Sequence, residues 1–408
     1  MEETKPSSTP VSPNASPSLE SLKILRTVGY FASFVTLGLM SASLGPSLPQ
    51  FAENTHSELS QVSFLFSARS LGYLVGSLQG GRLYDRVRGN RLMGVLLITM
   101  LASLAFAPLV DRLWLLTALL FVLGAGEGAV DVGGNILMMW THGEKVAPFM
   151  NGLHFFYGLG AFLSPIIVAQ AMLHTGGIQW AYWILAVIAL PVAIFQLSVP
   201  GPHQANASVD SPHSGKVNYV LVAWLGVVFI MYVGAEVSFG GWIYTYGLSM
   251  GMEKTLAAYL TSTFWGALTL GRLLSVPFAA RVKPRILILA DFIGCLASVL
   301  GLMILSKSQA VLWVGVFGAG LFMASIFPTM LTFAGQVVHI NGKVTGLFLV
   351  AASIGSMIFP WLIGQLFSKI GESATMYVIS TILAIGLLVF IALIIYLNQA
   401  KRKNIEVV

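Results

Sequence analysis

Charged residues are scarce in this sequence: Asp, Glu, Lys and Arg together make up 9% of its 408 residues, whereas a soluble domain carries about 25%. Hydrophobic residues make up 56% of the chain, so water is not the main solvent for its surface. The 22 Lys and Arg residues outnumber the 16 Asp and Glu residues, but they form no basic face or groove dense enough to follow a phosphate chain. We therefore expect a membrane protein that binds the lipid bilayer and no nucleic acid.

Cysteine and catalytic motifs are scarce too. The single cysteine, Cys295, lies in an apolar run, which excludes an intrachain disulfide framework and a cysteine-based metal cluster. The sequence has no G-x-S-x-G nucleophile motif, no H-E-x-x-H zinc motif, no phosphate-binding loop and no dinucleotide fingerprint. We expect neither an enzyme nor an ATP-driven pump, and no cofactor other than a coupling cation.

Long apolar runs, in contrast, are abundant. Because a membrane span needs about 20 mostly apolar residues, the sequence predicts twelve transmembrane helices near 27–49, 61–81, 91–110, 114–139, 147–172, 178–199, 218–246, 256–280, 286–305, 311–335, 345–368 and 376–397. The predicted fold class is an all-α membrane protein with two six-helix bundles. Its predicted parts are a disordered cytoplasmic tail over 1–23, a bundle over 24–199, a polar cytoplasmic linker over 200–216, a second bundle over 217–398 and a cytoplasmic tail over 399–408.

Lys and Arg residues predict the orientation, because basic residues accumulate on cytoplasmic loops. With the N-terminus inside, only Arg112, Lys254, Lys307 and Lys369 fall on outer loops, while most other basic residues fall on inner ones. Both termini should therefore be cytoplasmic. We expect a multi-pass protein of the plasma membrane or of a bacterial inner membrane, acting as a monomer.

The two halves look like one unit used twice. Gly72 to Arg82 has the same Gly-to-Arg spacing as Gly271 to Arg281, and three other glycine-rich stretches also match between the halves, all at offsets between 194 and 199 residues. Two six-helix halves related by an axis along the membrane normal would produce such a shared offset.

A charged motif follows the second span. Its residues Gly81, Asp85, Arg86, Gly89 and Arg91 resemble the G-x-x-x-D-R-x-x-G-x-R signature of the major facilitator superfamily. Glycine permits close helix approach, and an acid placed here can sit near a helix end and pair with arginines. The motif is predicted to act as a gate on the cytoplasmic side.

Within that superfamily the chain resembles the fucose-permease-like sugar symporters, in the branch of sodium-dependent glucose transporters. The similar stretches begin at Gly38, Gly124, Gly152, Val233 and Phe264. The resemblance implies the twelve-helix fold and cation-coupled transport of a sugar.

In the fourth span the resemblance extends to individual residues. In fucose permeases this span has a carboxylate followed four residues later by Asn, which resembles Asp131 and Asn135 here and implies a proton-coupling role for Asp131. Those permeases also have an acid in the first span, whereas the region around Gly45 has none.

Ionisable residues inside spans are the candidate coupling site, because each costs about 2.5–3.5 kcal/mol to insert and normally faces a cavity or a partner. The candidates are Arg69, Glu127, Asp131 and Glu236. Glu127, Asp131 and Asn135 share one helix face. Two acids one turn apart disfavour each other's charge, so one could hold a proton; alternatively Arg69 neutralises one of them, or their oxygens bind Na⁺ at Asp131.

A sugar site needs aromatic faces and hydrogen-bonding groups. The candidate substrate-binding residues are Asn135, Asn151, His154, Glu236, Trp242 and Trp265. A further acid, Asp291, lies nearer the cytoplasmic edge of its span and is expected to pair at the interface with the basic cluster Arg281 to Arg285. The repeated halves share their glycines but not these polar residues, which favours a role for the polar residues beyond packing.

The function predicted from these features is H⁺- or Na⁺-coupled uptake of a sugar by alternating access of the two halves. The alternative is a proton-coupled exporter of drug-like or other small metabolites. A more distant possibility is a receptor that binds a solute without moving it, because fold alone does not decide function.

Overall fold

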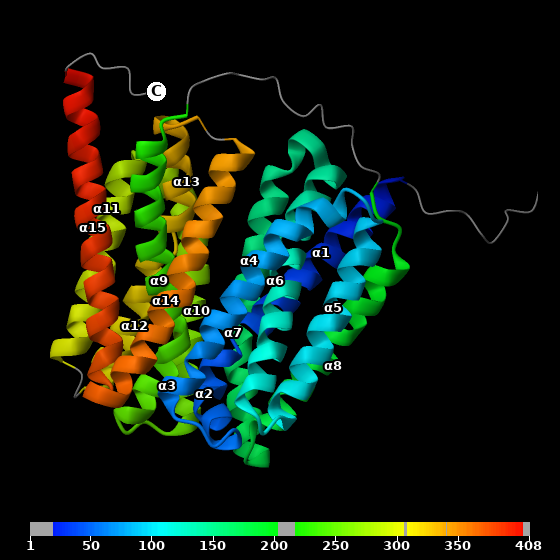
Figure 1. Cartoon of the computed structure of the whole chain (residues 1–408). Coiled ribbons are helices and arrows are strands. Elements are labelled where there is room, and N and C mark those ends of the chain that lie inside the picture. Colours follow the sequence, from blue (N-terminus) through cyan, green and yellow to red (C-terminus); the bar gives the residue numbers. More distant parts are fainter. Residues whose placement is uncertain (1–18, 203–216, 306–307, 340, 403–408) are drawn as a thin grey trace, which may run out of the picture.

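The computed structural model describes residues 19–202, 217–305, 308–339 and 341–402. The described chain is almost entirely helical and forms two bundles (Figure 1). The first contains α1 (Leu19–Ser41), α2 (Leu44–Asn54), α3 (Leu59–Val62), α4 (Phe64–Tyr84), α5 (Gly89–Phe106), α6 (Leu113–His142), α7 (Ala147–Thr175) and α8 (Ile178–Ser198). The second contains α9 (Tyr219–Ser249), α10 (Lys254–Ala279), α11 (Pro284–Ile304), α12 (Gln309–Met323), α13 (Ile326–Val337), α14 (Gly342–Ile370) and α15 (Ser373–Arg402).

The predicted number of spans is confirmed. Within the described residues, ten spans are long and apolar enough to cross a membrane by length and composition. The other two are α4 and α10, which are 21 and 26 residues long and less apolar, since each contains Gly, Ser and an arginine inside the helix, Arg69 or Arg272. The chain is therefore an all-α membrane protein with six spans in each bundle.

The helices overlap the predicted tails. Helix α1 already begins at Leu19, inside the segment 1–23 predicted to be disordered, and α15 continues to Arg402. Helix α9 begins after Asn218, whose side-chain oxygen accepts hydrogen bonds from the backbone N–H groups of Val220 and Leu221. The rest of the predicted tails, 1–18 and 403–408, and the linker segment 203–216 lie outside the described residues.

The internal repeat is visible in the packing of the helices. A Cβ atom on Gly160 of α7 would lie 2.1 Å from the carbonyl oxygen of Val35 in α1. In the second bundle, a Cβ on Gly355 of α14 would lie 2.1 Å from the carbonyl oxygen of Ile230 in α9. Both residues of the second pair follow those of the first at one offset, and in each bundle only glycine allows this approach of the two backbones.

Two spans that the sequence predicts to be continuous are each formed by two helices. The first span is broken between Ser41 and Leu44, and the tenth between Met323 and Ile326. A proline follows each break, Pro46 in α2 and Pro328 in α13. Since proline has no N–H to donate to the carbonyl four residues earlier, each break falls where the helix ladder is already interrupted.

Candidate functional site

A central cavity of about 690 Å³ lies between the two bundles. Its walls come from α1, α2, α4, α6 and α7 on one side and from α9, α10, α11, α13 and α14 on the other. The lining extends to Val282 and Pro284 beside the α10–α11 turn, toward the end of the molecule at which both described chain ends lie. At that end the bundles diverge in Figure 1, whereas they approach each other near α2 and α3.

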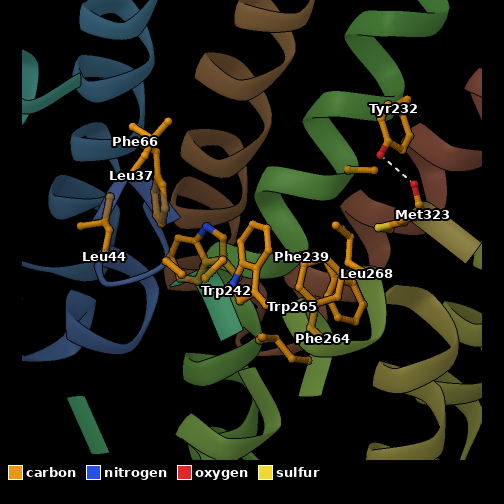
Figure 2. Packing of buried hydrophobic residues seen from close by; sticks show 14 of the residues in the cluster. Leu37, Leu44, Phe66, Tyr232, Phe239, Trp242, Phe264, Trp265, Leu268 and Met323 are labelled. Carbon is orange, nitrogen blue, oxygen red and sulfur yellow. Dashed lines mark hydrogen bonds between the residues drawn. The ribbon is translucent and has the colours of Figure 1, made fainter. Parts of the chain in front are cut away.

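Direct contacts between the bundles close the opposite end. The Ser67 hydroxyl donates to the carbonyl of Met357 across the bundles at 2.7 Å, and the Gln365 amide donates to the carbonyl of Ser60 at 2.7 Å. The rings of Phe66 and Trp242 face each other from the two bundles, with centroids 6.3 Å apart (Figure 2). The cavity is therefore open toward one side of the protein and closed toward the other.

Arg69 and Glu127 form a buried ion pair in the first bundle. The Arg69 Nε donates to Glu127 Oε2 at 2.8 Å, and Nη2 donates to Oε1. The same guanidinium donates to the carbonyls of Met40 and Ser41 at 3.0 Å each, where the first span is broken. Of the alternatives open from sequence, the structure therefore has Arg69 neutralising Glu127, and the pair also holds the break in place.

Asp131, one turn along α6, is the acid of this face that has no basic partner. The Tyr73 hydroxyl donates to its Oδ2, and the Asn135 amide donates to its Oδ1 at 3.2 Å and to its carbonyl at 2.8 Å. Asp131 lines the cavity, and none of the three ion pairs found among the described residues includes it. It is thus a half-buried acid that accepts hydrogen bonds from two neutral donors.

Glu236 of α9 lines the cavity from the second bundle. The Nη2 of Arg272 lies 3.6 Å from Glu236 Oε1, beyond hydrogen-bonding distance. The hydroxyl oxygen of Tyr232 lies 2.5 Å from the other carboxylate oxygen of Glu236, Oε2. Unlike Glu127, Glu236 therefore makes no hydrogen bond to the arginine beside it.

Three of the predicted substrate-binding side chains, Asn151, His154 and Trp265, also line the cavity. His154 packs edge-on against Phe34, with ring centroids 6.2 Å apart. The indole N–H of Trp265 is buried and has no hydrogen-bond partner within the described protein, although N–H groups at such depth are normally paired. It is thus an unpaired donor on a residue that lines the cavity.

The other two predicted substrate-binding residues lie elsewhere. Trp242 is fully buried, donates its N–H to the carbonyl of Pro360 at 2.9 Å and stacks on Phe367. Asn135 binds Asp131. Neither residue is part of the cavity lining, so their contacts place them as support for the closed end and for Asp131.

The predicted gating motif forms the turn between α4 and α5. Its residues Gly81, Asp85, Arg86, Gly89 and Arg91 lie at the open end of the protein, and all of them except Gly81 line a second cavity of about 510 Å³. Gly89 packs against the side chain of Leu137, whose end methyl group would lie 2.3 Å from a Cβ at this position. Asp85 is exposed and belongs to none of the ion pairs of the described residues.

Sequence reasoning missed the partners that these acids have. Tyr73 and Tyr232 bind Asp131 and Glu236, but neutral tyrosines in apolar helices give no signal of such a role. Asp291 does not pair with the Arg281 to Arg285 cluster: it is buried, and the hydroxyl of Ser325 donates to it. The expectation for Asp291 was wrong because α11 turns this residue inward onto the break in the tenth span.

Residues 30–360 match the model of the Major Facilitator Superfamily. The chain is 32% identical to "Sodium-dependent glucose transporter 1" of Xenopus laevis, over 80% of this chain and 72% of the relative. It is 31% identical to the protein of that name from Homo sapiens, over 83% and 73%. It is also 32% identical to the Danio rerio protein, over 83% of this chain, but there it spans only 64% of the relative's length.

Two solved structures show the same fold. The nucleoside transporter NupG superposes with a TM-score of 0.75 at 12% identity, covering 91% of this chain and 99% of the other. PepTSo2 superposes with a TM-score of 0.73 at 12% identity, covering 93% and 99%. With its two six-span bundles, central cavity and family match, the chain belongs to the Major Facilitator Superfamily, in the branch of the sodium-dependent glucose transporter 1 proteins.

Proposed function

We propose that this protein takes up a sugar together with a cation by alternating access, and that Asp131 binds the coupling cation. One observation carries the proposal. A cavity between two repeat-related bundles is closed at one end and open at the other, and Asp131 is the one lining acid of the described chain that has no arginine beside its carboxylate. Movement of one bundle against the other around such a fixed site would expose it to each side in turn.

The open side is proposed to be the cytoplasm. The α4–α5 turn with Arg86 and Arg91 and the α10–α11 turn with Arg281 and Arg285 are both at the end where the cavity opens. Basic loops remain in the cytoplasm. The structure then corresponds to an inward-open state, from which a solute carried into the cell would be released.

A proton fits the site better than Na⁺. Hard metal cations need several oxygen ligands, but the donors at Asp131 are a hydroxyl proton of Tyr73 and the NH₂ group of Asn135. Three oxygens that do converge, those of Met40, Ser41 and Glu127, already bind the guanidinium of Arg69. The arginine therefore occupies the position where a metal ion would have to bind.

The sugar is supported by the names of the relatives and by the lining of the cavity. A neutral polyol needs donors and acceptors beside an apolar face. Asn151 and His154 from α7 and Glu236 from α9 supply the polar groups, and Trp265 from α10 adds an aromatic side chain to the lining.

Transport in proteoliposomes tests the proposal. Labelled glucose, fucose and galactose are offered in counterflow without a gradient, and then with either a pH gradient or a Na⁺ gradient imposed. We expect counterflow of at least one sugar and its accumulation under the pH gradient. Asp131→Asn should keep counterflow but abolish accumulation.

A matched control removes an equivalent charge far from the cavity. Asp111, whose side chain is 77% exposed, is changed to Asn, and this variant should accumulate sugar like the parent. If Asp131→Asn accumulates sugar as well, Asp131 is not the coupling residue. Accumulation driven by Na⁺ alone would overturn the choice of the proton.

Export of drug-like cations is a second candidate, favoured by one observation. Asp131 leaves a negative charge without a basic partner in a lining that also contains Phe34, Phe66 and Phe155, and a lipophilic cation binds to acids and aromatic faces. Efflux of a fluorescent cation from loaded vesicles, combined with no counterflow of any sugar, would favour this function over sugar uptake.

A further inference from the structure

The break in the tenth span is held from both sides by polar side chains. The carbonyl of Met323, the last residue of α12, accepts a hydrogen bond from the Tyr232 hydroxyl at 2.8 Å (Figure 2). Beyond the break, the Ser325 hydroxyl donates to Asp291. Tyr232 is fully buried, so water does not replace its hydroxyl as the donor to the carbonyl. The bend between α12 and α13 thus depends on whether Tyr232 donates its hydrogen bond to the Met323 carbonyl or to another acceptor.

Tyr232 has two neighbours that both accept. Its oxygen lies 2.8 Å from the Met323 carbonyl and 2.5 Å from Glu236 Oε2. A phenol has one proton and donates one such bond, and a carbonyl cannot donate. Both contacts are satisfied together only when Glu236 is protonated, so that Glu236 donates to Tyr232 and Tyr232 donates to Met323.

Loss of that proton would rearrange the chain of bonds. A charged carboxylate attracts the Tyr232 proton more strongly than a carbonyl does, because hydrogen bonds to charged acceptors are about twice as strong. The carbonyl of Met323 would then lose its donor at a depth where unpaired carbonyls are unfavourable. Arg272, at 3.6 Å, could close on the charged Glu236 at the same time.

Among the groups around Tyr232, Glu236 is the one whose protonation state decides where Tyr232 donates its hydrogen bond. On other helices its charged or titratable neighbours are Arg272 of α10, Tyr157 of α7 and Cys295 of α11. On α2, α13, α14 and α15, which also pack against α9, charged residues occur only near helix ends or not at all. Asp291 contacts the far side of the break.

We infer that Tyr232 is a positioning residue that transmits the protonation state of Glu236 to the α12–α13 break and so controls the position of α13. The inference rests on the proposed transport function and deepens it. Helix α13 is the element that would move, because Phe327, Pro328 and Thr332 of this helix form the wall of the cavity. With Glu236 protonated the wall stays as in this structure, and deprotonation releases it.

Thiol labelling tests this without any substrate. Thr332, exposed on the cavity wall, is changed to Cys in the full-length protein; the natural Cys295 is fully buried and gives little background. The maleimide labelling rate is measured in proteoliposomes between about pH 5.5 and about pH 8 and normalised to the same thiol in unfolded protein, which removes the pH dependence of thiol reactivity.

The parent should label about 2- to 10-fold faster at the low end of this range, the factor expected for one net hydrogen bond. Glu236→Gln, whose amide can still donate to Tyr232, should label at the fast rate at every pH. Tyr232→Phe should label at one slower rate at every pH, and the double variant should behave like Tyr232→Phe. Tyr377→Phe, a change at an exposed tyrosine of α15, should keep the parent profile.

A pH profile in Tyr232→Phe that keeps the parent slope would overturn the inference, because a purely structural tyrosine shifts the rate equally at all pH values. An intermediate rate in the double variant, with effects that add, would overturn it as well. Failure of the proposed function gives a different result, namely no sugar counterflow in the parent while its labelling still depends on pH.

Discussion

The Arg69–Glu127 pair gives the sharpest stability prediction. The side chains are only 11% and 5% exposed, and removing one member of a buried pair costs about 3–5 kcal/mol because the other charge stays buried. Arg69→Met and Glu127→Leu should each lower the free energy of unfolding by about that amount. In the double variant no charge remains, and the chief loss is the two hydrogen bonds to the Met40 and Ser41 carbonyls, about 1 kcal/mol each.

The double variant should therefore be more stable than either single variant. Unfolding of the purified protein by titration with dodecyl sulfate in mixed micelles measures all three. The control is the exposed Arg112–Asp111 pair, 3.9 Å apart with side chains 73% and 77% exposed, where Asp111→Asn should cost less than about 1 kcal/mol. A double variant that loses the sum of the two single losses would refute the pairing, and with it the argument that Asp131 is the acid left to bind the coupling cation.

Three further predictions concern helix packing, ligand binding and closure. Gly76→Ala should lower the yield and stability of the folded protein, since its Cβ would lie 1.9 Å from a carbonyl oxygen of α6, whereas Gly346→Ala, with nothing within 4 Å, should not; equal stability of both would contradict the packing. Trp265→Phe removes an unpaired N–H and should weaken sugar binding about 2- to 10-fold in a direct binding assay, so unchanged affinity would show that the N–H does not contact the solute. Gln365→Leu removes a hydrogen bond across the closed end. It should raise about 2- to 10-fold the rate at which an impermeant thiol reagent, added from that side, labels a cysteine introduced at Ser70. An unchanged rate would show that this bond does not hold the end closed.

The number of spans and their grouping could be predicted because both follow from local composition. Each span is a run of apolar residues long enough to cross the bilayer. The sequence repeat predicted two similar halves, and the equivalent contacts of Gly160 with Val35 and of Gly355 with Ile230 agree with it. Neither inference required knowledge of which helix contacts which.

The pairing of the buried charges could be narrowed from the sequence but not decided. Helical periodicity places Glu127 and Asp131 on one face, yet it does not say which of them Arg69, from another span, will reach. The structure decides it through close contact of α4 and α6, where a Cβ on Gly124 would lie 2.0 Å from the carbonyl of Arg69. That approach places the guanidinium beside Glu127 and places Tyr73, one turn further along α4, beside Asp131.

The two broken spans show why proline in the sequence was not enough to predict a helix break. Proline is present beyond both breaks, at Pro46 and Pro328, but prolines at other positions, such as Pro165 and Pro360, remain inside continuous helices. At each break a side chain from another part of the fold donates to a carbonyl at the helix end: Arg69 at the first span and Tyr232 at the tenth. Neighbouring side chains are what allow backbone to leave the helix inside a membrane, and they cannot be assigned from local sequence.

The chemical difference between those two donors has a mechanistic consequence. Arginine keeps its charge at any physiological pH, so the break in the first span is held by a bond that does not titrate. Tyr232 shares its single proton with Glu236, so the break in the tenth span responds to pH while its counterpart does not. Two breaks of the same kind would change together and leave the halves equivalent. With one fixed and one titratable break, proton binding can move one wall of the cavity relative to the other. Coupling a proton to alternating access requires such a difference between the halves.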